Sequence, residues 1–139
     1  MAFEPVRVGC LGMGWWSDVL ADAIVKSGKL KIVSCFTRSE EKKQAFAKKY
    51  GCGTAASYDA MLADPSIEAI INTTPNSVHL ETTRQAAEAG KHTFLDKPIA
   101  NTVADGLEIA RVCDKAGVIV SLGYQRRREN QFQIGRAHV

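Results

Sequence analysis

The fold is decided near the start of the chain, by the stretch Val6-Arg7-Val8-Gly9-Cys10-Leu11-Gly12-Met13-Gly14-Trp15-Trp16-Ser17. This pattern predicts a short apolar strand that breaks into a glycine turn and then opens a helix. Gly12 permits the tight turn, and Gly14 lets a pyrophosphate approach the main chain without meeting a Cβ atom. The helix that follows would offer unpaired N–H groups and its positive dipole end to the phosphates. Ser17 stands where the dinucleotide-binding fingerprint G-x-G-x-x-G has its third glycine. A pair of glycines alone is a weak indication of nucleotide binding.

Beyond this turn, strand and helix patterns alternate about six times. Strands are predicted from residue 6 and over 30–36, 53–56, 69–72, 92–95 and 118–122, with helices ending at Gly28, Gly51, Gly90 and Gly117 and a short helix over 57–63. Two apolar helix stripes are expected: Leu20, Ala23 and Ile24 in the first helix, and Val103, Leu107, Ala110 and Cys113 in the last, over 103–116. With right-handed crossovers, this alternation predicts an α/β fold with a doubly wound parallel sheet of the Rossmann type.

Length and charge narrow the possible partners. A chain of 139 residues can build one core and is too short for two ordinary domains. Its net charge of +3 is too small to indicate nucleic-acid binding, and we interpret its one dense basic run, Arg126-Arg127-Arg128, as a solvated segment. No apolar run approaches the length of a membrane span. We therefore expect a small-molecule substrate, with no nucleic acid and no membrane as partners.

Cysteine and histidine usage indicates neither disulfides nor a metal site. The four cysteines form no C-x-x-C pair, and Cys10 and Cys35 fall within predicted buried strands. Buried free thiols of a reducing, cytoplasmic compartment explain them best. The three histidines are scattered along the sequence, so no metal ligand set is predicted.

Polar or glycine-containing segments follow five of the predicted strands. Because ligands bind at the carboxyl ends of the strands in such a sheet, these segments together predict a dinucleotide site. They are Gly12-Met13-Gly14, Thr37-Arg38, Thr74-Pro75-Asn76, Asp96-Lys97-Pro98 and Gly123-Tyr124-Gln125.

Three further side chains near these segments are candidate cofactor-binding residues, and each also has an alternative interpretation. Trp15 and Trp16 would cover the pyrophosphate or pack against another part of the protein, and Trp16 in the helix–sheet core is the plainer interpretation. His79 would face the cofactor, or serve only as a local hydrogen-bonding residue at the start of a helix.

The end of the second predicted strand selects the cofactor. A site for NAD usually has a carboxylate there, which binds the ribose 2′-hydroxyl. This chain has Thr37-Arg38-Ser39 instead, and a guanidinium between two hydroxyls can hold a 2′-phosphate. We therefore predict NADP as the cofactor, with NAD possible. In the alternative, Arg38 is a solvated loop residue and Glu40 or Glu41 contacts the ribose.

Lys97 is the candidate catalytic residue. It stands at a strand end between Asp96 and a proline, so a rigid turn, which a cis peptide would suit, fixes its position. In a cleft its ammonium group would orient a substrate hydroxyl and assist proton transfer during hydride transfer. Taken alone, Lys97 also fits a plain surface lysine.

Taken together, the five segments and His79 resemble the glucose–fructose oxidoreductase / inositol dehydrogenase / rhizopine catabolism (Gfo/Idh/MocA) family. The Asp-Lys-Pro turn at 96–98 after Thr-Pro-Asn at 74–76 is the most specific element, since it follows the family's Glu-Lys-Pro and Thr-Pro-Asn motifs in order and spacing. The resemblance implies hydride transfer between a nicotinamide and a sugar, polyol or related hydroxyl, with Lys97 near the reacting carbon. It also implies that Asp96 contacts the nicotinamide ribose, although Asp96 is one methylene shorter than the usual Glu.

The resemblance also implies a longer protein. Family members carry a second α/β domain, which supplies an Asp and a His to the active site and makes the oligomer contact, so we expect a homo-oligomer. We expect an NAD(P)-binding domain over 1–125, the start of a connector over 126–133, and a non-native tail over 134–139 that matches a translated sequencing adapter. The whole protein would be an NAD(P)-dependent dehydrogenase, and the alternative is a non-enzymatic nucleotide-sensing regulator on the same fold.

Overall fold

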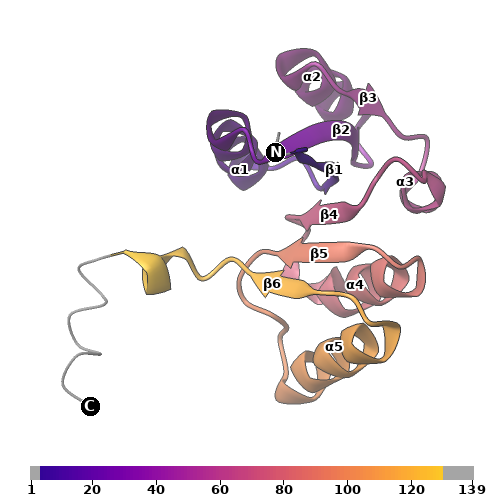
Figure 1. Cartoon of the computed structure of the whole chain (residues 1–139), viewed down its shortest axis with the longest axis vertical. Coiled ribbons are helices and arrows are strands. Elements are labelled where there is room, and N and C mark those ends of the chain that lie inside the picture. The colour runs from indigo at the N-terminus through magenta and orange to yellow at the C-terminus, as the bar shows by residue number, and fades with distance from the viewer. Residues whose placement is uncertain (1–3, 130–139) are drawn as a thin grey trace.

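Six parallel strands form one sheet in the computed structural model, which describes residues 4–129 of the chain (Figure 1). The sheet order is β3-β2-β1-β4-β5-β6, and every neighbouring pair is parallel. This confirms the doubly wound sheet, whose strand order reverses between β1 and β4 and so opens a crevice there. The strands are β1 (Val6–Leu11), β2 (Leu30–Phe36), β3 (Gly53–Thr54), β4 (Ala69–Asn72), β5 (His92–Leu95) and β6 (Val120–Leu122).

Five α-helices connect these strands within the described residues: α1 (Trp15–Ser27), α2 (Glu40–Tyr50), α3 (Tyr58–Ala63), α4 (His79–Glu88) and α5 (Val103–Ala116). Two short 3₁₀ turns lie at Asn76–Val78 and Gln125–Arg128. The predicted glycine stops of α1, α2 and α5 are confirmed, since each adopts a left-handed conformation with φ between 64° and 68°.

The helices cover both faces of the sheet (Figure 1). On one face, α1 and α2 bury residues such as Ile24 and Phe46 against Val8 and Cys10. On the other face, α3 and α4 pack against β1 and β4, and α5 packs beside α4. Cys10, Cys35 and Cys113 are buried free thiols, as predicted, and burial raises the pKa of the Cys10 thiol to about 12.

Two predicted helix stripes are corrected by the structure. In α5, Val103 and Leu107 are 81% and 67% exposed, while Ile109 and Cys113 face the core. The stripe was ambiguous because this helix carries apolar residues on two sides, and its contact with α4 decides which side is buried. In α1, Ala21 is buried beside Ile24, whereas Ala23 is exposed.

Other differences are confined to element ends. The helix predicted to end at Gly90 is α4, which follows a 3₁₀ turn at Asn76–Val78 and ends at Glu88, and β3 and β6 are shorter than the predicted strands. The proposed non-native tail over 134–139, and the connector from residue 130, lie outside the described residues. None of the helices within residues 4–129 is long and apolar enough to cross a membrane.

Candidate dinucleotide site

The glycine turn after β1 is fixed to its neighbours on both sides. Gly12 has φ +87°, and a Cβ atom there would lie 3.1 Å from the backbone of Thr73 and Thr74. The Gly12 N–H donates to the carbonyl of Phe36 (3.0 Å), and Thr73 Oγ1 donates to the carbonyl of Gly12 (2.8 Å). Only glycine fits this position without displacing the backbone of the adjacent loop.

Gly14 has a different environment from Gly12. A Cβ atom at Gly14 would meet no described atom within 4 Å, so packing within residues 4–129 does not require a glycine there. The open space beside its backbone lies at the start of α1, and no side chain caps this helix at Gly14. Space and uncapped helix N–H groups at one point are what a diphosphate needs.

Ser17 occupies the place of the third fingerprint glycine without disturbing the turn. Its side chain is buried, and its hydroxyl donates to the carbonyl of Gly14 at 2.6 Å. The buried hydroxyl of Ser17 therefore has a hydrogen-bond partner, and the small side chain lets α1 pack close to the sheet.

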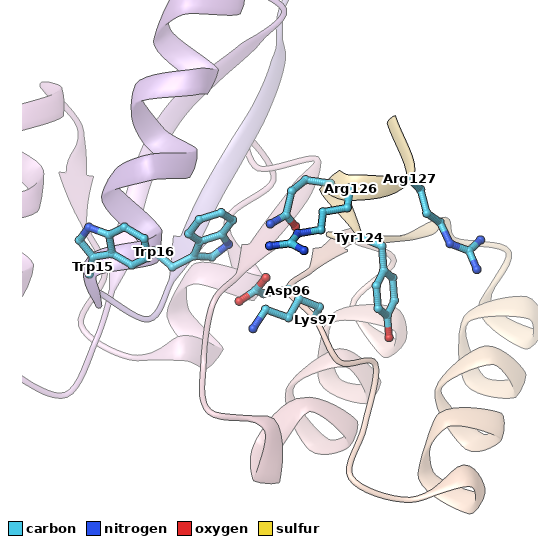
Figure 2. A pocket seen from close by; sticks show the side chains of 8 residues that line it. Trp15, Trp16, Asp96, Lys97, Tyr124, Arg126 and Arg127 are labelled. Carbon is cyan, nitrogen blue, oxygen red and sulfur yellow. The ribbon is translucent and has the colours of Figure 1, made fainter. Parts of the chain in front are cut away.

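A pocket of about 720 Å³ lies between the start of α1 and the segments that follow β5 and β6 (Figure 2). Its volume is in the range of small-molecule sites. The pocket brings together several predicted site residues from three segments of the sequence. Its lining consists of Trp15, Trp16, Asp96, Lys97, Tyr124, Gln125, Arg126 and Arg127.

Two arginines of this pocket were missed by the sequence interpretation. Arg126 and Arg127 belong to the basic run that the sequence pattern indicates as a solvated segment, yet both line the pocket, and the Arg127 guanidinium lies 6.0 Å from the ring centre of Tyr124. Their place next to Gly123-Tyr124-Gln125, the segment that follows β6, was the signal that could have found them.

Two buried polar atoms of the pocket residues lack a hydrogen-bond partner among residues 4–129: Trp16 Nε1 and Asp96 Oδ1. Buried polar groups are almost always satisfied by protein, water or ligand. A polar ligand or water in this pocket would therefore be stabilised, and the residues present fit the ribose of a dinucleotide. Gly123 keeps the room for this carboxylate, since a Cβ atom there would lie 3.3 Å from Asp96 Oδ1.

Lys97 follows Asp96 on the loop after β5, and its side chain is exposed at the pocket. The Asp96 N–H donates to the carbonyl of Asn72 at 3.0 Å, which fixes the start of this loop to β4. The Lys97–Pro98 peptide bond is cis, in agreement with the expected turn.

His79 lies outside the pocket and is fully buried. Its Nδ1 lies 2.9 Å from the carbonyl oxygen of Pro98, and its Nε2 lies 3.0 Å from that of Thr74. Because both ring nitrogens contact backbone, His79 offers no free nitrogen to a cofactor. The structure corrects that expectation: His79 is a local hydrogen-bonding residue that connects the Thr74 loop to the Lys97 loop.

The Thr74-Pro75-Asn76 segment lies at the same edge of the sheet but does not line the large pocket. Its start is held by Asn72, whose Oδ1 accepts from the backbone N–H (3.1 Å) and the hydroxyl (2.7 Å) of Thr74. Pro75 and Asn76 are exposed. This segment therefore offers a rigid, open wall beside the glycine turn.

The end of β2 also lies outside the large pocket. Thr37 is half-buried, and Arg38 is exposed. A smaller cavity of about 310 Å³ lies between the start of α1 and α2, lined by Met13, Gly14, Trp15, Ser17, Asp18, Lys42, Ala45, Phe46 and Lys49. Lys42 was missed by the sequence interpretation, although its place one turn after Ser39 sets it near this edge.

Glu40, one of the two alternative ribose ligands beside Glu41, is already engaged by its own helix. Lys43 Nζ lies 2.8 Å from one carboxylate oxygen, and Gln44 Nε2 donates to the other at 2.8 Å. These hydrogen bonds from Gln44 and Lys43 lower the pKa of the Glu40 carboxyl. Within the part of the chain that the structure describes, no cluster of three His, Cys, Asp or Glu side chains could hold a metal ion.

This sheet order, the glycine turn after β1 and the pocket at the carboxyl edge together define a nucleotide-binding Rossmann domain. Residues 6–124 match the model of an oxidoreductase family described as having an NAD-binding Rossmann fold. The chain belongs to this family, Gfo/Idh/MocA, and the resemblance expected from the motifs is confirmed.

Curated relatives and solved structures agree with this assignment. The chain is 32% identical over 133 residues to the scyllo-inositol 2-dehydrogenase (NADP(+)) IolW of Bacillus subtilis. This match spans 93% of the chain and 36% of that protein. The WlbA dehydrogenase of Bordetella pertussis, solved with NADH and UDP-GlcNAcA, has a TM-score of 0.93 at 28% identity over 99% of the chain and 40% of its own. Biliverdin reductase of Synechocystis, solved with biliverdin and NADP+, has a TM-score of 0.86 at 27% identity over 97% of the chain and 43% of its own. The chain thus spans only about a third of the length of the curated relatives it matches.

Proposed function

We propose that this chain is the cofactor-binding domain of an NAD(P)-dependent oxidoreductase that transfers a hydride between the nicotinamide and a sugar, polyol or related hydroxyl or carbonyl substrate. The observation that carries the proposal is the pocket of about 720 Å³ in which Trp16, Asp96 and Lys97 meet beside the glycine turn. The names of the relatives add support for the substrate class, since they include an inositol dehydrogenase and a 1,5-anhydro-D-fructose reductase.

The proposed roles follow from where each group lies. The turn from Gly12 through Met13 and Gly14, with the start of α1 at Trp15, would hold the diphosphate through backbone N–H groups. Thr74, Pro75 and Asn76 would line the opposite wall of the crevice. Asp96 would bind the ribose next to the nicotinamide, with Gln125 nearby.

Lys97 is the proposed catalytic residue. The nicotinamide, when bound, supplies or accepts the hydride. The ammonium group of Lys97 would donate a hydrogen bond to the reacting substrate oxygen and move a proton at that atom as the carbon–oxygen bond order changes. Its exposure at the pocket allows this contact, and the neighbouring Asn72 and His79 contacts hold its loop in place.

Turnover needs more of the protein than this chain. The family's second domain would complete the active site with an Asp and a His and would make the oligomer contact. We therefore expect the 139-residue chain to bind a dinucleotide weakly and to turn over no substrate. A measurable dehydrogenase rate from this chain alone would contradict that expectation.

The proposed cofactor is NADP rather than NAD. Arg38, exposed after β2, is the group that would bind the 2′-phosphate, with Thr37 beside it and Lys42 lining the cavity next to α2. No carboxylate directly follows β2 in the sequence, and Glu40, one of the two alternative ribose ligands, is occupied by Lys43 and Gln44.

Calorimetric titration of the chain with NADPH and with NADH tests this proposal. The wild type should bind NADPH more tightly than NADH. Arg38→Asp should weaken NADPH binding by about tenfold or more, since it removes a charge-assisted contact and adds a like charge. Lys29→Asp is the matched control, because it makes the same charge change at an exposed residue just before β2, at the opposite edge of the sheet. Failure of the wild type to bind either dinucleotide would refute the function, and equal NADPH affinity in both variants would refute the role of Arg38.

A further inference from the structure

Three of the four cysteines meet on the face of the sheet that α1 and α2 cover. Cys10 of β1 and Cys35 of β2 are partners in register, and both belong to the same buried core cluster. Cys52, which lies between α2 and β3, packs against that cluster. We propose that Cys35 and Cys52 form a peroxide-sensitive modification site, at which the two thiols are oxidised to a reversible disulfide. This inference does not depend on nucleotide binding.

The fold places the Cys35 and Cys52 side chains against each other at the edge of the sheet, where Figure 1 shows β3 beside β2. Cys35 pairs in register with Thr54 of β3, and Cys52 precedes Thr54 by two residues, which is the spacing that returns a side chain to the same face. The Cys52 N–H donates to the carbonyl of Ala47 at 3.1 Å, and Cys35 Sγ donates to the carbonyl of Lys43 at 3.6 Å. Both cysteines are thus held against α2, and their thiols are hydrogen-bonded to each other.

The two thiols differ in exposure and acidity, as a peroxide-reactive thiol and its resolving partner do. Cys52 is half-buried, whereas Cys35 is fully buried. The hydrogen bond between the thiols lowers the pKa of Cys52, and the same hydrogen bond together with burial raises the pKa of Cys35. Because the thiolate is the nucleophile and peroxide has to reach it, Cys52 is the thiol that reacts first.

The other two thiols are poorer targets for peroxide. Burial raises the pKa of the Cys10 thiol to about 12. Cys113 is buried in α5, on the opposite face of the sheet, and burial raises its pKa as well. Neither thiol combines access from solvent with a lowered pKa, so Cys52 is the point of entry.

The reaction takes place in two balanced steps. The Cys52 thiolate attacks hydrogen peroxide, an S–O bond forms as the O–O bond breaks, and the leaving hydroxide takes up a proton as water. The sulfur of Cys35 then attacks the sulfenic acid of Cys52, an S–S bond forms as the S–O bond breaks, and the hydroxyl leaves as water with the proton of the Cys35 thiol. Two thiols and one peroxide thus give one disulfide and two waters, and an external dithiol reverses the oxidation by exchange.

The disulfide would bridge the two ends of one segment of the domain. This segment runs from the end of β2 through α2, and it carries Arg38 and Lys42. A bridge that closes such a loop restricts the unfolded chain and so favours the folded one.

Peptide mapping of the oxidised wild-type chain tests the site. The reduced 139-residue chain is treated with hydrogen peroxide while folded, its remaining thiols are capped with N-ethylmaleimide, and its tryptic peptides are identified by mass. The chain should lose two hydrogen atoms and link peptide 32–38 to peptide 50–84 through Cys35 and Cys52. Dithiothreitol should separate the two peptides again.

Two serine variants sharpen the test. Cys52→Ser should abolish the link and slow the consumption of thiols by peroxide by about tenfold or more, since only buried thiols remain. Cys113→Ser is the matched control, because it removes a thiol on the other face and should leave the link and the rate unchanged. Mapping of the wild-type chain decides the question even if Cys52→Ser fails to fold.

Three results of the mapping would overturn the assignment. A link that contains Cys10 would show that the wrong thiol pairs with Cys35. Oxidation of Cys52 to a sulfinic acid without any link would show that Cys35 does not reach it. A folded chain that keeps all four thiols after exposure to excess peroxide would show that Cys52 is not reactive.

Urea denaturation shows whether the disulfide belongs to the native fold. The oxidised chain should unfold at a higher urea concentration than the reduced chain, and dithiothreitol should restore the original midpoint. An unchanged or lower midpoint would show that the bridge forms only by distorting the fold, and would overturn the assignment of a native site.

Discussion

Gly12 and Gly14 stand two residues apart in the same turn, yet different physical constraints act on them. At Gly12 the constraint is internal, because φ is +87° and a Cβ atom would lie 3.1 Å from the backbone of Thr73 and Thr74. At Gly14 the surroundings within 4 Å are open. The first glycine therefore serves the fold, and the second is free to serve a ligand.

Alanine substitutions at these two positions should separate stability from binding. Gly12→Ala should lower the free energy of unfolding by about 1–3 kcal/mol, the typical cost of a strained left-handed conformation. Gly14→Ala should lower it by no more than about 1 kcal/mol, since alanine is only a poorer N-cap there, but should weaken NADPH binding. Urea denaturation and NADPH titration check the two effects. Equal destabilisation by both variants would contradict this division.

Residue-level roles could be predicted from the sequence only where the backbone dictates them. The glycine turn, the helix stops and the rigid Lys97–Pro98 turn are fixed by φ preferences that the residue types reveal. The orientation of His79 could not be foreseen, because it depends on carbonyl groups of two loops that meet only in the folded chain. The same holds for Trp16, which lines a pocket instead of packing fully in the core.

At the scale of elements, α5 shows how far an apolar pattern can be trusted. Its boundaries were predicted correctly, because Gly117 ends it and Thr102 caps it by accepting from the Asp105 N–H at 3.1 Å. The buried face of α5 was predicted wrongly, because Leu107 and Ile109 are both apolar and lie on different sides of the helix. The contact with α4, which the sequence of α5 alone does not contain, decides the orientation.

Alanine variants of α5 should report that orientation directly. Ile109→Ala should cost about 2–5 kcal/mol of unfolding free energy, since it leaves a cavity where a fully buried side chain packs. Leu107→Ala removes a comparable side chain from a position that is 67% exposed and should change stability by about 0.5 kcal/mol or less. Chemical denaturation measures both, and a larger loss from Leu107→Ala would restore the predicted stripe.

At the scale of the whole molecule, the parallel sheet is what converts scattered motifs into one site. Strands that all run in one direction place the residues after β1, β2, β4, β5 and β6 at a single edge. This consequence could be predicted, because it follows from alternation of elements and handedness alone. The division of that edge into a large pocket and a smaller cavity could not be predicted from the sequence. Side chains far apart in the sequence, such as Trp16 and Arg126, form the walls of the large pocket.

The central claim is that this edge binds a dinucleotide, and amide chemical shifts during an NADPH titration of the ¹⁵N-labelled chain test it most directly. Changes should concentrate in the five segments at the carboxyl edge, residues 12–16, 37–38, 74–76, 96–98 and 123–125. Loops at the opposite edge, such as residues 28–29 and 117–119, should stay unchanged and serve as the internal control. Saturable shifts at the opposite edge, or no saturable shifts at all from a folded chain, would contradict the claim.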